Sequence, residues 1–501
     1  MNPYALAGRM PDLLANRAGV SPERVAIVAP DGTWTFREWD RRASAVAARL
    51  RDAGVRPGDR VALLGWNSAA YAAAVFGAGR AGAVLAPLNA RLAAAELAWQ
   101  LADLDATALL YDAACAAIAQ ALAGERPRLA LVPLEEAVAA EPLPEAPGPV
   151  ELAAVHTIVY TSGTTGRPRG AVLTWGNHLW SAIASALNLG LRGDDRWLAC
   201  LPMFHVGGLS LLFKSALYGM PLVVHTSFDP ERANRAIDEE GVTIVSVVAA
   251  MLQRMLDARG GRPYPASLRC VLLGGGPAPV PLLEACASIG APVVQTYGLT
   301  EAASQVATMP PDETRRKPGS AGRPLPGVEL RIVRDDGADA APGEPGAILA
   351  RGPMVMAGYW RQPEATAAAL GDGWLHTGDI GYLDPEGYLY VLDRREDLII
   401  SGGENVYAAE VEAALLTHPA VSEAAVVGAP DERWGQAVAA AVVLKPGAEL
   451  SEDDLRAFCR ERLAAYKVPS RIRFVDALPR TSSGKLQRRL LRERWFAGGP
   501  D

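Results

Sequence analysis

Residues 156–170 read HTIVYTSGTTGRPRG, a β-branched run followed by a loop of glycines, hydroxyl side chains and two arginines. The run at 156–160 predicts a buried strand. Glycines let backbone N–H groups approach a phosphate closely, and serine and threonine hydroxyls add hydrogen-bond donors around it. The stretch therefore fits a phosphate-binding loop after a strand, and a polar turn of glycine and threonine is the alternative at this point. It is not a Walker A loop, because no Gly-Lys-Ser/Thr closes it.

Segments on both sides of this loop alternate between helical and strand-like patterns. Helical spacing of apolar residues is found at 36–53, 69–78 and 209–214. Short apolar or β-branched runs predict strands at 60–65, 156–160, 221–225, 242–248, 270–273 and 292–295. This alternation is typical of crossover units and parallel sheets. The expected fold is therefore an α/β fold with parallel-type sheets.

The composition of the sequence changes after about residue 318. Glycine and proline become dense, and short strands are expected at 328–333, 347–350 and 388–392, which indicates a small antiparallel or barrel-like unit. The charge cluster DRRED at 393–397 follows, and a compact pattern of strands and helices comes after it. We expect a large N-terminal domain over 1–393, a hinge at 394–397 and a small α+β C-terminal domain over 398–501.

Composition and charge exclude several classes of protein. Of the 501 residues, 50% are hydrophobic and 21% charged, so the chain can bury a sizeable core. A net charge of −7 argues against a nucleic-acid binder. Five cysteines, none in a C-x-x-C pair, argue against a disulfide scaffold or a zinc site and favour the reducing cytoplasm. Residues 1–19 lack a secretory pattern, and Arg80 interrupts the most apolar stretch, so no stable membrane insertion is expected.

Five further blocks follow the loop along the chain. They are QTYGLTE at 295–301, WLHTGD at 374–379, DRRED at 393–397, SGGEN at 401–405 and PRTSSGK at 479–485. Together with the loop, and in this order, they resemble the motifs of the adenylate-forming superfamily, which includes acyl- and aryl-CoA ligases, luciferases and peptide-synthetase adenylation domains. The resemblance implies a large domain with stacked sheets and a small mobile domain. Arg167 and Arg169 stand where the superfamily usually has lysine, which keeps the charge and changes its geometry.

The resemblance also implies a nucleotide site. Tyr297 would pack on adenine, Asp379 would bind the ribose, and Glu301 would hold Mg²⁺, which suits an aromatic face and hard carboxylate oxygens. The implied nucleotide-binding residues are Thr161, Ser162, Gly163, Thr164, Thr165, Gly166, Arg167, Gly275, Gly276, Tyr297, Thr300, Asp379, Arg394 and Lys485. The implied catalytic residues are Lys485, Thr300, Glu301 and His205. Taken singly, Asp379 could be a turn residue, Glu301 a helix cap and Lys485 a solvated charge.

An acyl pocket is expected beside the nucleotide. Three glycines at 274–276 leave room for a flat ring. Lys214 ends an apolar stretch, so it is either a surface lysine with a buried stem or a cation that meets a second carboxylate of the substrate. The likeness is strongest to ligases of the superfamily that activate an aromatic dicarboxylic acid, and this favours the second role. The expected acyl-pocket residues are His205, Lys214, Gly274, Gly275 and Ser304.

The resemblance also implies a CoA-binding site and a hinge between the two domains. By position in the resemblance, the CoA contacts would be Gly402, Gly403, Trp434, Tyr466 and Lys467. The pivot of the hinge would be Glu396, where the superfamily commonly has aspartate. Trp434 and Lys467 could equally belong to the core of the small domain.

The expected activity is that of an ATP-, CoA- and Mg²⁺-dependent acid–thiol ligase that acts on small molecules. Two alternatives stay open at this point. One is another aryl- or medium-chain acyl-CoA synthetase, and the other is an adenylation module that passes its product to a carrier protein. No nucleic-acid partner is expected, and the sequence leaves the oligomeric state open.

Overall fold

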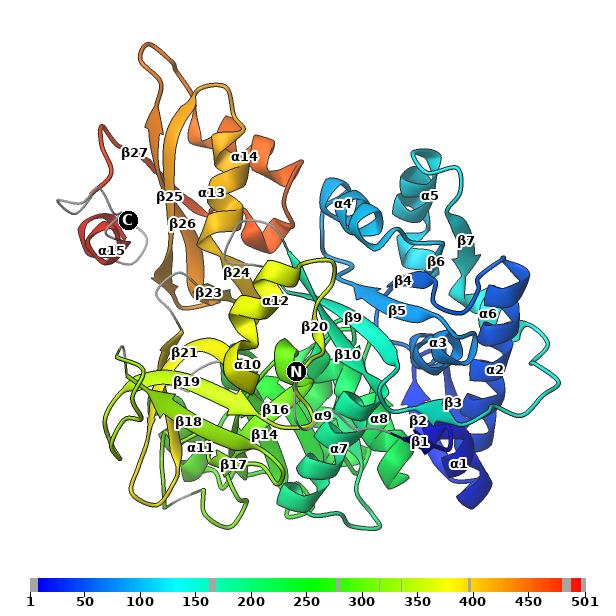
Figure 1. Cartoon of the computed structure of the whole chain (residues 1–501). Coiled ribbons are helices and arrows are strands. Elements are labelled where there is room, and N and C mark those ends of the chain that lie inside the picture. Colours follow the sequence, from blue (N-terminus) through cyan, green and yellow to red (C-terminus); the bar gives the residue numbers. More distant parts are fainter. Residues whose placement is uncertain are drawn as a thin grey trace. The chain divides into compact units, whose positions relative to one another are not determined.

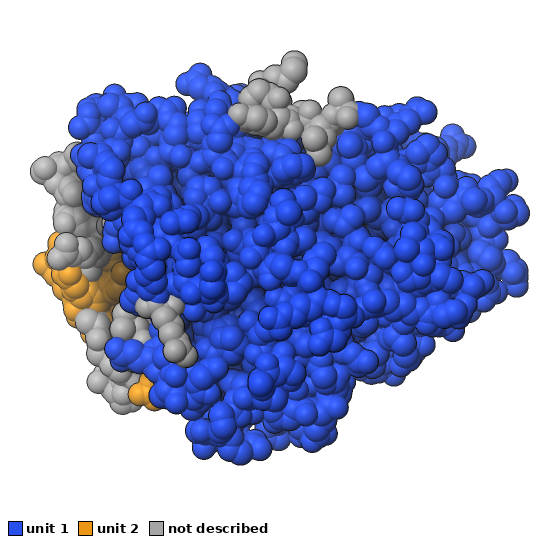
Figure 2. Space-filling model, turned by 90° about the horizontal axis from the view of Figure 1, so that it is seen from below, with its two compact units in different colours: residues 1–90, 101–160, 170–392 blue, residues 91–100, 161–169, 393–501 orange. Residues whose placement is uncertain are grey.

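The computed structural model describes residues 8–161, 168–275, 280–314, 316–334, 336–394, 398–479 and 488–496. The chain forms two compact units, coloured separately in Figure 2. The first unit contains residues 1–90, 101–160 and 170–392, and the second contains residues 91–100, 161–169 and 393–501. The boundary at 392–393 lies beside the charge cluster of the sequence.

Two large sheets, mostly parallel, organise the first unit (Figure 1). The seven-stranded sheet has the order β20 (Gly358–Tyr359), β10 (Arg169–Thr174), β9 (Val155–Thr161), β5 (Val84–Leu88), β4 (Arg60–Leu64), β6 (Ala108–Tyr111) and β7 (Ala130–Pro133). The nine-stranded sheet has the order β17 (Arg323–Pro324), β16 (Ser304–Thr308), β15 (Val293–Leu299), β14 (Cys270–Gly274), β13 (Ile244–Val248), β11 (Trp197–Ala199), β12 (Leu222–Val224), β2 (Val25–Ala29) and β3 (Gly32–Thr35).

The remaining elements of this unit are helices and two smaller sheets. The helices are α1 (Leu13–Val20), α2 (Phe36–Asp52), α3 (Ala69–Arg80), α4 (Ala94–Leu104), α5 (Ala116–Gly124), α6 (Leu134–Ala139), α7 (Trp175–Leu189), α8 (Val206–Tyr218), α9 (Pro230–Glu239), α10 (Ala249–Arg259), α11 (Val280–Ser288) and α12 (Pro363–Ala369). The first residues of α4, 94–100, belong to the second unit. An antiparallel sheet contains β18 (Glu329–Val333), β19 (Gly346–Arg351), β21 (Leu375–Leu383) and β22 (Leu389–Arg394), and β1 (Arg9–Met10) pairs with β8 (Val150–Glu151).

The nine-stranded sheet is buried on both faces. In β14, Cys270 and Leu272 belong to a core shared with the seven-stranded sheet and with helices α2, α3, α7 and α8. Val271 and Leu273 of the same strand belong to a second core with α9, α10 and α11. Successive side chains of a strand point to opposite faces, so a strand that is apolar at every position fits between two helical layers. The continuous apolar runs in the sequence thus correspond to strands that are buried on both faces of the sheet.

The second unit is a five-stranded sheet with helices. Its strands are β24 (Glu404–Tyr407), β23 (Leu398–Ser401), β26 (Gly435–Leu444), β25 (Val421–Asp431) and β27 (Arg471–Phe474), and its helices are α13 (Ala408–Leu416), α14 (Glu452–Arg460) and α15 (Arg488–Trp495). Helix α14 ends at Arg460, and a short 3₁₀ turn, Ala465–Lys467, follows Ala464. The predicted α/β class, with a large N-terminal part and a small C-terminal part, is confirmed.

Two histidines are buried in the core between the two large sheets. The Nε2 of His156 lies 3.1 Å from the carbonyl oxygen of Val75, and the Nε2 of His178 lies 2.8 Å from the hydroxyl of Thr157. The ring of His178 also stacks on Phe213 at 4.1 Å. Burial lowers the pKa of His156 to about 4 and lowers the pKa of His178 well below its ordinary value. Both side chains are therefore neutral in the folded chain at pH 7.

We expect these histidines to make the first unit sensitive to acid. In the unfolded chain each histidine protonates near pH 6.5, whereas in the folded chain the pKa is about 4 for His156 and well below its ordinary value for His178. Stability therefore falls as the pH drops below about 6.5, by up to about 1.4 kcal/mol per pH unit and group. The thermal unfolding midpoint, measured from pH 7.5 to 5, should fall less steeply in His156→Gln, which keeps a donor for Val75. The exposed control His376→Gln should keep the wild-type slope. Identical slopes in all three proteins would contradict this expectation.

Among the described residues, no helix combines the length and the apolar character that a membrane span requires.

Candidate active site

Two residues that the sequence assigns to the nucleotide meet in the first unit. Tyr297 lies near the end of β15, and Asp379 lies in β21. The hydroxyl of Tyr297 donates a hydrogen bond to Oδ2 of Asp379 at 2.6 Å, and the two residues are only 7% and 4% exposed. Asp379 is thus one member of a buried pair and not a solvated turn residue. The pair holds a carboxylate beside an aromatic ring.

The glycines at the end of β14 lie at the same edge of the sheet. The register pairs Val248 of β13 with Gly274, and β14 is parallel to β15. A Cβ on Gly274 would lie 3.0 Å from Cγ2 of Thr296. Gly275 has φ of +83°, and a Cβ there would lie 2.8 Å from Cγ1 of Val248. A side chain would be strained at Gly275 and crowded at Gly274. Bare backbone therefore lies at the carboxyl end of the sheet, where α/β folds bind ligands.

Glu301 is held by two hydrogen bonds from one segment. It lies in the 3₁₀ turn Thr300–Ala302, which follows β15 directly. The hydroxyl of Tyr359 donates to Oε1 of Glu301 at 2.9 Å, and the backbone N–H of Met356 donates to the Glu301 carbonyl at 2.8 Å. These contacts fix both the backbone and the carboxylate of Glu301.

The same carboxylate fits the chemistry of Mg²⁺. This ion prefers oxygen ligands and is usually bound by one or two carboxylates together with phosphates and water. In the described part of the chain no group of three or more His, Cys, Asp or Glu side chains could hold a metal alone. A single oriented carboxylate therefore agrees with a metal that a nucleotide brings to the site.

The backbone after Glu301 is strained. Ala303 has φ of +51° and Ser304 has φ of +129°, although neither is glycine. A Cβ on Gly298 would lie 1.8 Å from the carbonyl oxygen of Ser304, at a register shift between β15 and β16. The hydroxyl of Ser181 donates to the Ala303 carbonyl at 2.9 Å and helps to hold this conformation. Strain of this kind is maintained by the surrounding structure and is frequent at functional sites.

Lys214 is a buried cation within helix α8. It is 1% exposed, so a surface lysine with a solvated end is excluded. Its Nζ donates to Oε1 of Gln305 at 2.8 Å and lies 4.9 Å from the centre of the Trp197 ring. Gln305 in turn donates to the hydroxyls of Thr308 at 3.0 Å and Thr296 at 3.3 Å. The network thus joins Lys214 to Thr296, the neighbour of Gly274.

The electrostatics of Lys214 are unusual for a structural residue. Burial lowers its pKa to about 7. Among the ion pairs of the described residues, none includes Lys214. A buried ammonium that has an amide and an aromatic ring as neighbours is costly, and such groups are frequent where a charged ligand binds. Of the other predicted acyl-pocket residues, Ser304 precedes Gln305 in the chain, and His205 precedes α8 with its ring 4.8 Å from Phe204.

Only part of the phosphate loop lies in the described part of the chain. Thr161 ends β9, and its hydroxyl donates to the Arg169 carbonyl at 3.3 Å. Arg394 ends β22. The predicted residues Ser162, Gly163, Thr164, Thr165, Gly166, Arg167, Gly276, Glu396 and Lys485 lie outside the described residues. Their roles stay predictions.

In the second unit, two predicted CoA residues lie together. The backbone N–H of Gly402 donates to the Trp434 carbonyl at 2.9 Å, and a Cβ on Gly402 would lie 2.7 Å from the Trp434 ring. Trp434 is 41% exposed, and the guanidinium of Arg433 lies 4.6 Å from its ring centre. Gly403 also has a positive φ, of 85°. An exposed aromatic face beside a cation and bare backbone can bind a nucleotide or a pantetheine chain.

Lys467 lies in the interior of the second unit. Its Nζ donates to Oε1 of Glu410 at 2.6 Å and to Oε1 of Glu96 at 2.9 Å. Although burial by itself would lower the pKa of Lys467, the nearby acidic groups raise it above its ordinary value. These contacts give Lys467 a structural role as the partner of two carboxylates. The contacts of Lys467 and the adjacent Tyr466 with CoA stay predictions.

Comparison with known proteins identifies the family. A model of the AMP-binding enzyme family matches residues 14–360, and a model of its C-terminal domain matches residues 410–485. The chain belongs to the AMP-binding enzyme family. This AMP-binding enzyme is 53% identical over 487 residues to 2-succinylbenzoate–CoA ligase of Geobacillus kaustophilus, with 96% of this chain and 97% of the relative covered.

Comparison with solved structures identifies the same family. A double mutant of o-succinylbenzoate CoA synthetase from Bacillus subtilis, bound to a product analogue, matches with a TM-score of 0.91 and 43% identity, covering 97% of this AMP-binding enzyme and 99% of that chain. The B. subtilis enzyme in complex with ATP and magnesium ion matches with a TM-score of 0.74 and 43% identity, covering 97% and 100%. The sequence-based recognition of the adenylate-forming superfamily is confirmed.

Two residues of this site have no signal in the sequence. Gln305 contacts Lys214 across 91 positions, and Tyr359 contacts Glu301 across 58 positions. Neither residue lies within one of the six sequence blocks named above. Only the fold brings each of them to its partner.

Proposed function

We propose that this chain is a 2-succinylbenzoate–CoA ligase, which converts its acid, ATP and CoA to 2-succinylbenzoyl-CoA, AMP and pyrophosphate. The family and the named relatives support an AMP-forming acid–CoA ligase. The observation that carries the choice of acid is the buried Lys214, whose neighbours Gln305 and Trp197 leave its charge without a carboxylate among the described contacts. The substrate has two carboxylates, one to be activated and one on the aromatic ring.

In the first half-reaction, an oxygen of the succinyl carboxylate attacks the α-phosphorus of ATP, and the bond from that phosphorus to pyrophosphate breaks. We assign Tyr297 to the adenine and Asp379 to the ribose hydroxyls, with the Tyr297 hydroxyl orienting the carboxylate of Asp379. Thr161, Thr300 and the loop between Thr161 and Arg169 would donate to the phosphates. Glu301 would hold Mg²⁺, which neutralises phosphate charge when it is bound. Lys485 would contact the attacking carboxylate and the α-phosphate.

In the second half-reaction, the sulfur of CoA attacks the acyl carbon, the bond from that carbon to the AMP oxygen breaks, and the thiol proton is released. We assign Gly402, Gly403 and Trp434 to the approach of CoA, because bare backbone and an exposed ring lie together there. The intermediate is a bound adenylate, so the reaction needs no nucleophilic cysteine. All five cysteines are free and buried.

Lys214 would orient the acid. An ammonium that pairs with the ring carboxylate fixes one end of the substrate and leaves the succinyl carboxylate to face the nucleotide. Gln305 would then act through Lys214, since its amide holds the ammonium in place. The glycines at 274 and 275 would leave room for the ring.

The experiment that tests this function is a product analysis. Purified protein is incubated with 2-succinylbenzoate, ATP, Mg²⁺ and CoA, and the products are identified by mass spectrometry. The proposal expects AMP, pyrophosphate and 2-succinylbenzoyl-CoA in equal amounts, with no thioester when CoA is omitted. Pyrophosphate release without consumption of CoA would favour an adenylation module that serves a carrier protein.

A substitution at the predicted hinge separates the two half-reactions. Glu396 is the pivot by resemblance, and proline there would fix φ near −65° and restrict the turning of the small domain. We expect Glu396→Pro to keep acid-dependent exchange of pyrophosphate into ATP and to block thioester formation. Glu396→Ala, which keeps the freedom of φ, should support both steps. Equal loss of both steps in Glu396→Pro would reject the hinge assignment.

We further propose that the enzyme works in the cytoplasm and serves menaquinone biosynthesis, the pathway in which ligases of this kind act. Free, buried cysteines agree with a reducing compartment.

A further inference from the structure

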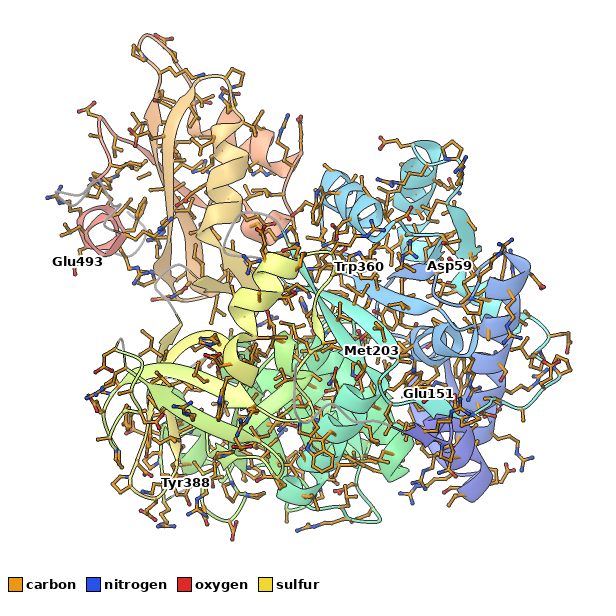
Figure 3. All side chains as sticks on the ribbon, viewed as in Figure 1. Asp59, Glu151, Met203, Trp360, Tyr388 and Glu493 are labelled. Carbon is orange, nitrogen blue, oxygen red and sulfur yellow. The ribbon has the colours of Figure 1, made fainter. Side chains whose placement is uncertain are left out.

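The segment that contains Tyr359 lies between two parts of the proposed site. In β20, Tyr359 is paired with Ala171 of β10, the strand that follows the phosphate loop. Trp360, labelled in Figure 3, continues this contact through its backbone N–H, which donates to the Gly170 carbonyl at 2.8 Å. Its indole N–H donates to the Asp103 carbonyl at 3.1 Å. The segment is therefore anchored both to β10 and to helix α4.

The opposite side of the same segment holds Glu301. The hydroxyl of Tyr359 reaches Oε1, and the N–H of Met356 reaches the carbonyl of Glu301. The backbone of Tyr359 is itself fixed, because its N–H donates to the hydroxyl of Thr366 at 2.8 Å. A tyrosine has two side-chain torsions, so a fixed backbone and a partly buried ring leave its hydroxyl little freedom. One rigid donor thus sets the direction of the Glu301 carboxylate.

We propose that Tyr359 is a positioning residue for the metal: its hydroxyl engages Oε1 of Glu301 and turns Oε2 toward the Mg²⁺ that accompanies ATP. This inference rests on the proposed function, since it requires Glu301 to be a metal ligand. Residues that orient a ligating carboxylate through a hydrogen bond commonly tune metal affinity. Because the segment 356–360 also pairs with β10, Tyr359 holds the metal carboxylate in register with the strand that carries the phosphate loop.

The backbone strain next to Glu301 gives an independent reason for a hydrogen bond that fixes the Glu301 carboxylate. Ala303 and Ser304 have positive φ, so the turn that bears Glu301 is held in place by its contacts and not by its own preference. Without the bond from Tyr359, the carboxylate would sample more orientations at the end of this turn. The expected consequence is weaker metal binding with an unchanged nucleoside site.

The test compares metal binding in four proteins. Tyr359→Phe removes one hydroxyl and keeps the ring, which also lines a cavity of about 670 Å³ with residues of α12 and β10. Tyr264→Phe is the matched control, because it also removes one hydroxyl bond, to Asn234, elsewhere in the unit. Glu301→Gln removes the proposed ligand itself. Mn²⁺ is titrated in the presence of a non-hydrolysable ATP analogue, and free Mn²⁺ is measured by electron paramagnetic resonance.

We expect the Mn²⁺ dissociation constant to rise about tenfold in Tyr359→Phe and more in Glu301→Gln, and to stay at the wild-type value in Tyr264→Phe. Binding of AMP without metal, and thioester formation from supplied acyl-adenylate, should be unchanged in Tyr359→Phe. Wild-type Mn²⁺ binding in Tyr359→Phe with weakened binding in Glu301→Gln would overturn the inference alone. Wild-type binding in Glu301→Gln would overturn the metal assignment within the proposed function, and a loss of AMP binding in Tyr359→Phe would reveal a general structural role.

Discussion

Replacing Lys214 with methionine should reduce kcat/KM for 2-succinylbenzoate by about 10²- to 10³-fold, because the ring carboxylate would then be buried without a partner. Methionine keeps the length and apolar stem of lysine, so the packing of α8 is preserved. The analogue that lacks the ring carboxylate, 4-oxo-4-phenylbutanoate, should be used equally well by both proteins. The measurement is CoA-dependent turnover with each acid.

The matched control is Lys317→Met, which removes an ammonium paired with Asp384 at 2.6 Å in the antiparallel region of the same unit. It should keep the wild-type preference between the two acids. If Lys214→Met lost activity equally on both acids, Lys214 would be structural and the choice of a dicarboxylic substrate would lose its main support.

The pH dependence gives a second readout of the same residue. Burial lowers the pKa of Lys214 to about 7, so its ammonium is charged below this pH and neutral above it. A carboxylate pairs only with the charged form. We therefore expect kcat/KM for 2-succinylbenzoate to fall as the pH rises through about 7, by up to about tenfold per pH unit. With 4-oxo-4-phenylbutanoate, kcat/KM should not show this fall as the pH rises through about 7.

Replacing Lys485 with alanine should slow adenylate formation by about 10²- to 10³-fold, the usual cost of losing one preorganised contact to the charge that develops in the transition state. Lys485 lies outside the described residues, and the prediction rests on the block at 479–485. The measurement is acid-dependent exchange of labelled pyrophosphate into ATP. Thioester formation from supplied acyl-adenylate should be retained, because Lys485 is assigned to the first half-reaction alone.

The control for this variant is Lys445→Ala, which removes a lysine from the loop after β26. It should exchange pyrophosphate at the wild-type rate. Equal rates for Lys485→Ala and Lys445→Ala would mean that Lys485 is a solvated charge, as an isolated lysine in a segment rich in serine and glycine would be.

The elements of the fold were predictable because their signals are local. Helix α2 begins after Thr35, where the side chain of Thr35 accepts from the Glu38 N–H and the Glu38 carboxylate accepts from the Thr35 N–H, a capping box that the sequence contains within four positions. The strands β13 and β14 are apolar at nearly every position because both of their faces are covered. Such patterns need no knowledge of distant residues.

The candidate site was predictable only where a motif marks a residue. The pair of Tyr297 and Asp379 belongs to two such motifs, and the fold brings them together across 82 positions. The state of Lys214 was left open by the sequence, because an apolar helix with one lysine describes both a surface residue and a buried one. Its burial depends on β16 and β11, which supply Gln305 and Trp197. Tyr359 could not be found, because its role exists only through its contact with Glu301.

The choice of acid is tested by the specificity of the wild-type enzyme in a CoA-dependent assay over 2-succinylbenzoate, 4-oxo-4-phenylbutanoate, benzoate, 4-coumarate and octanoate. We expect kcat/KM for 2-succinylbenzoate to exceed that for 4-oxo-4-phenylbutanoate by about 10²-fold or more at pH 7, since these two acids differ only in the carboxylate assigned to Lys214. Equal values for these two acids, or a preference for 4-coumarate or octanoate, would contradict the assignment of a dicarboxylic substrate to this site.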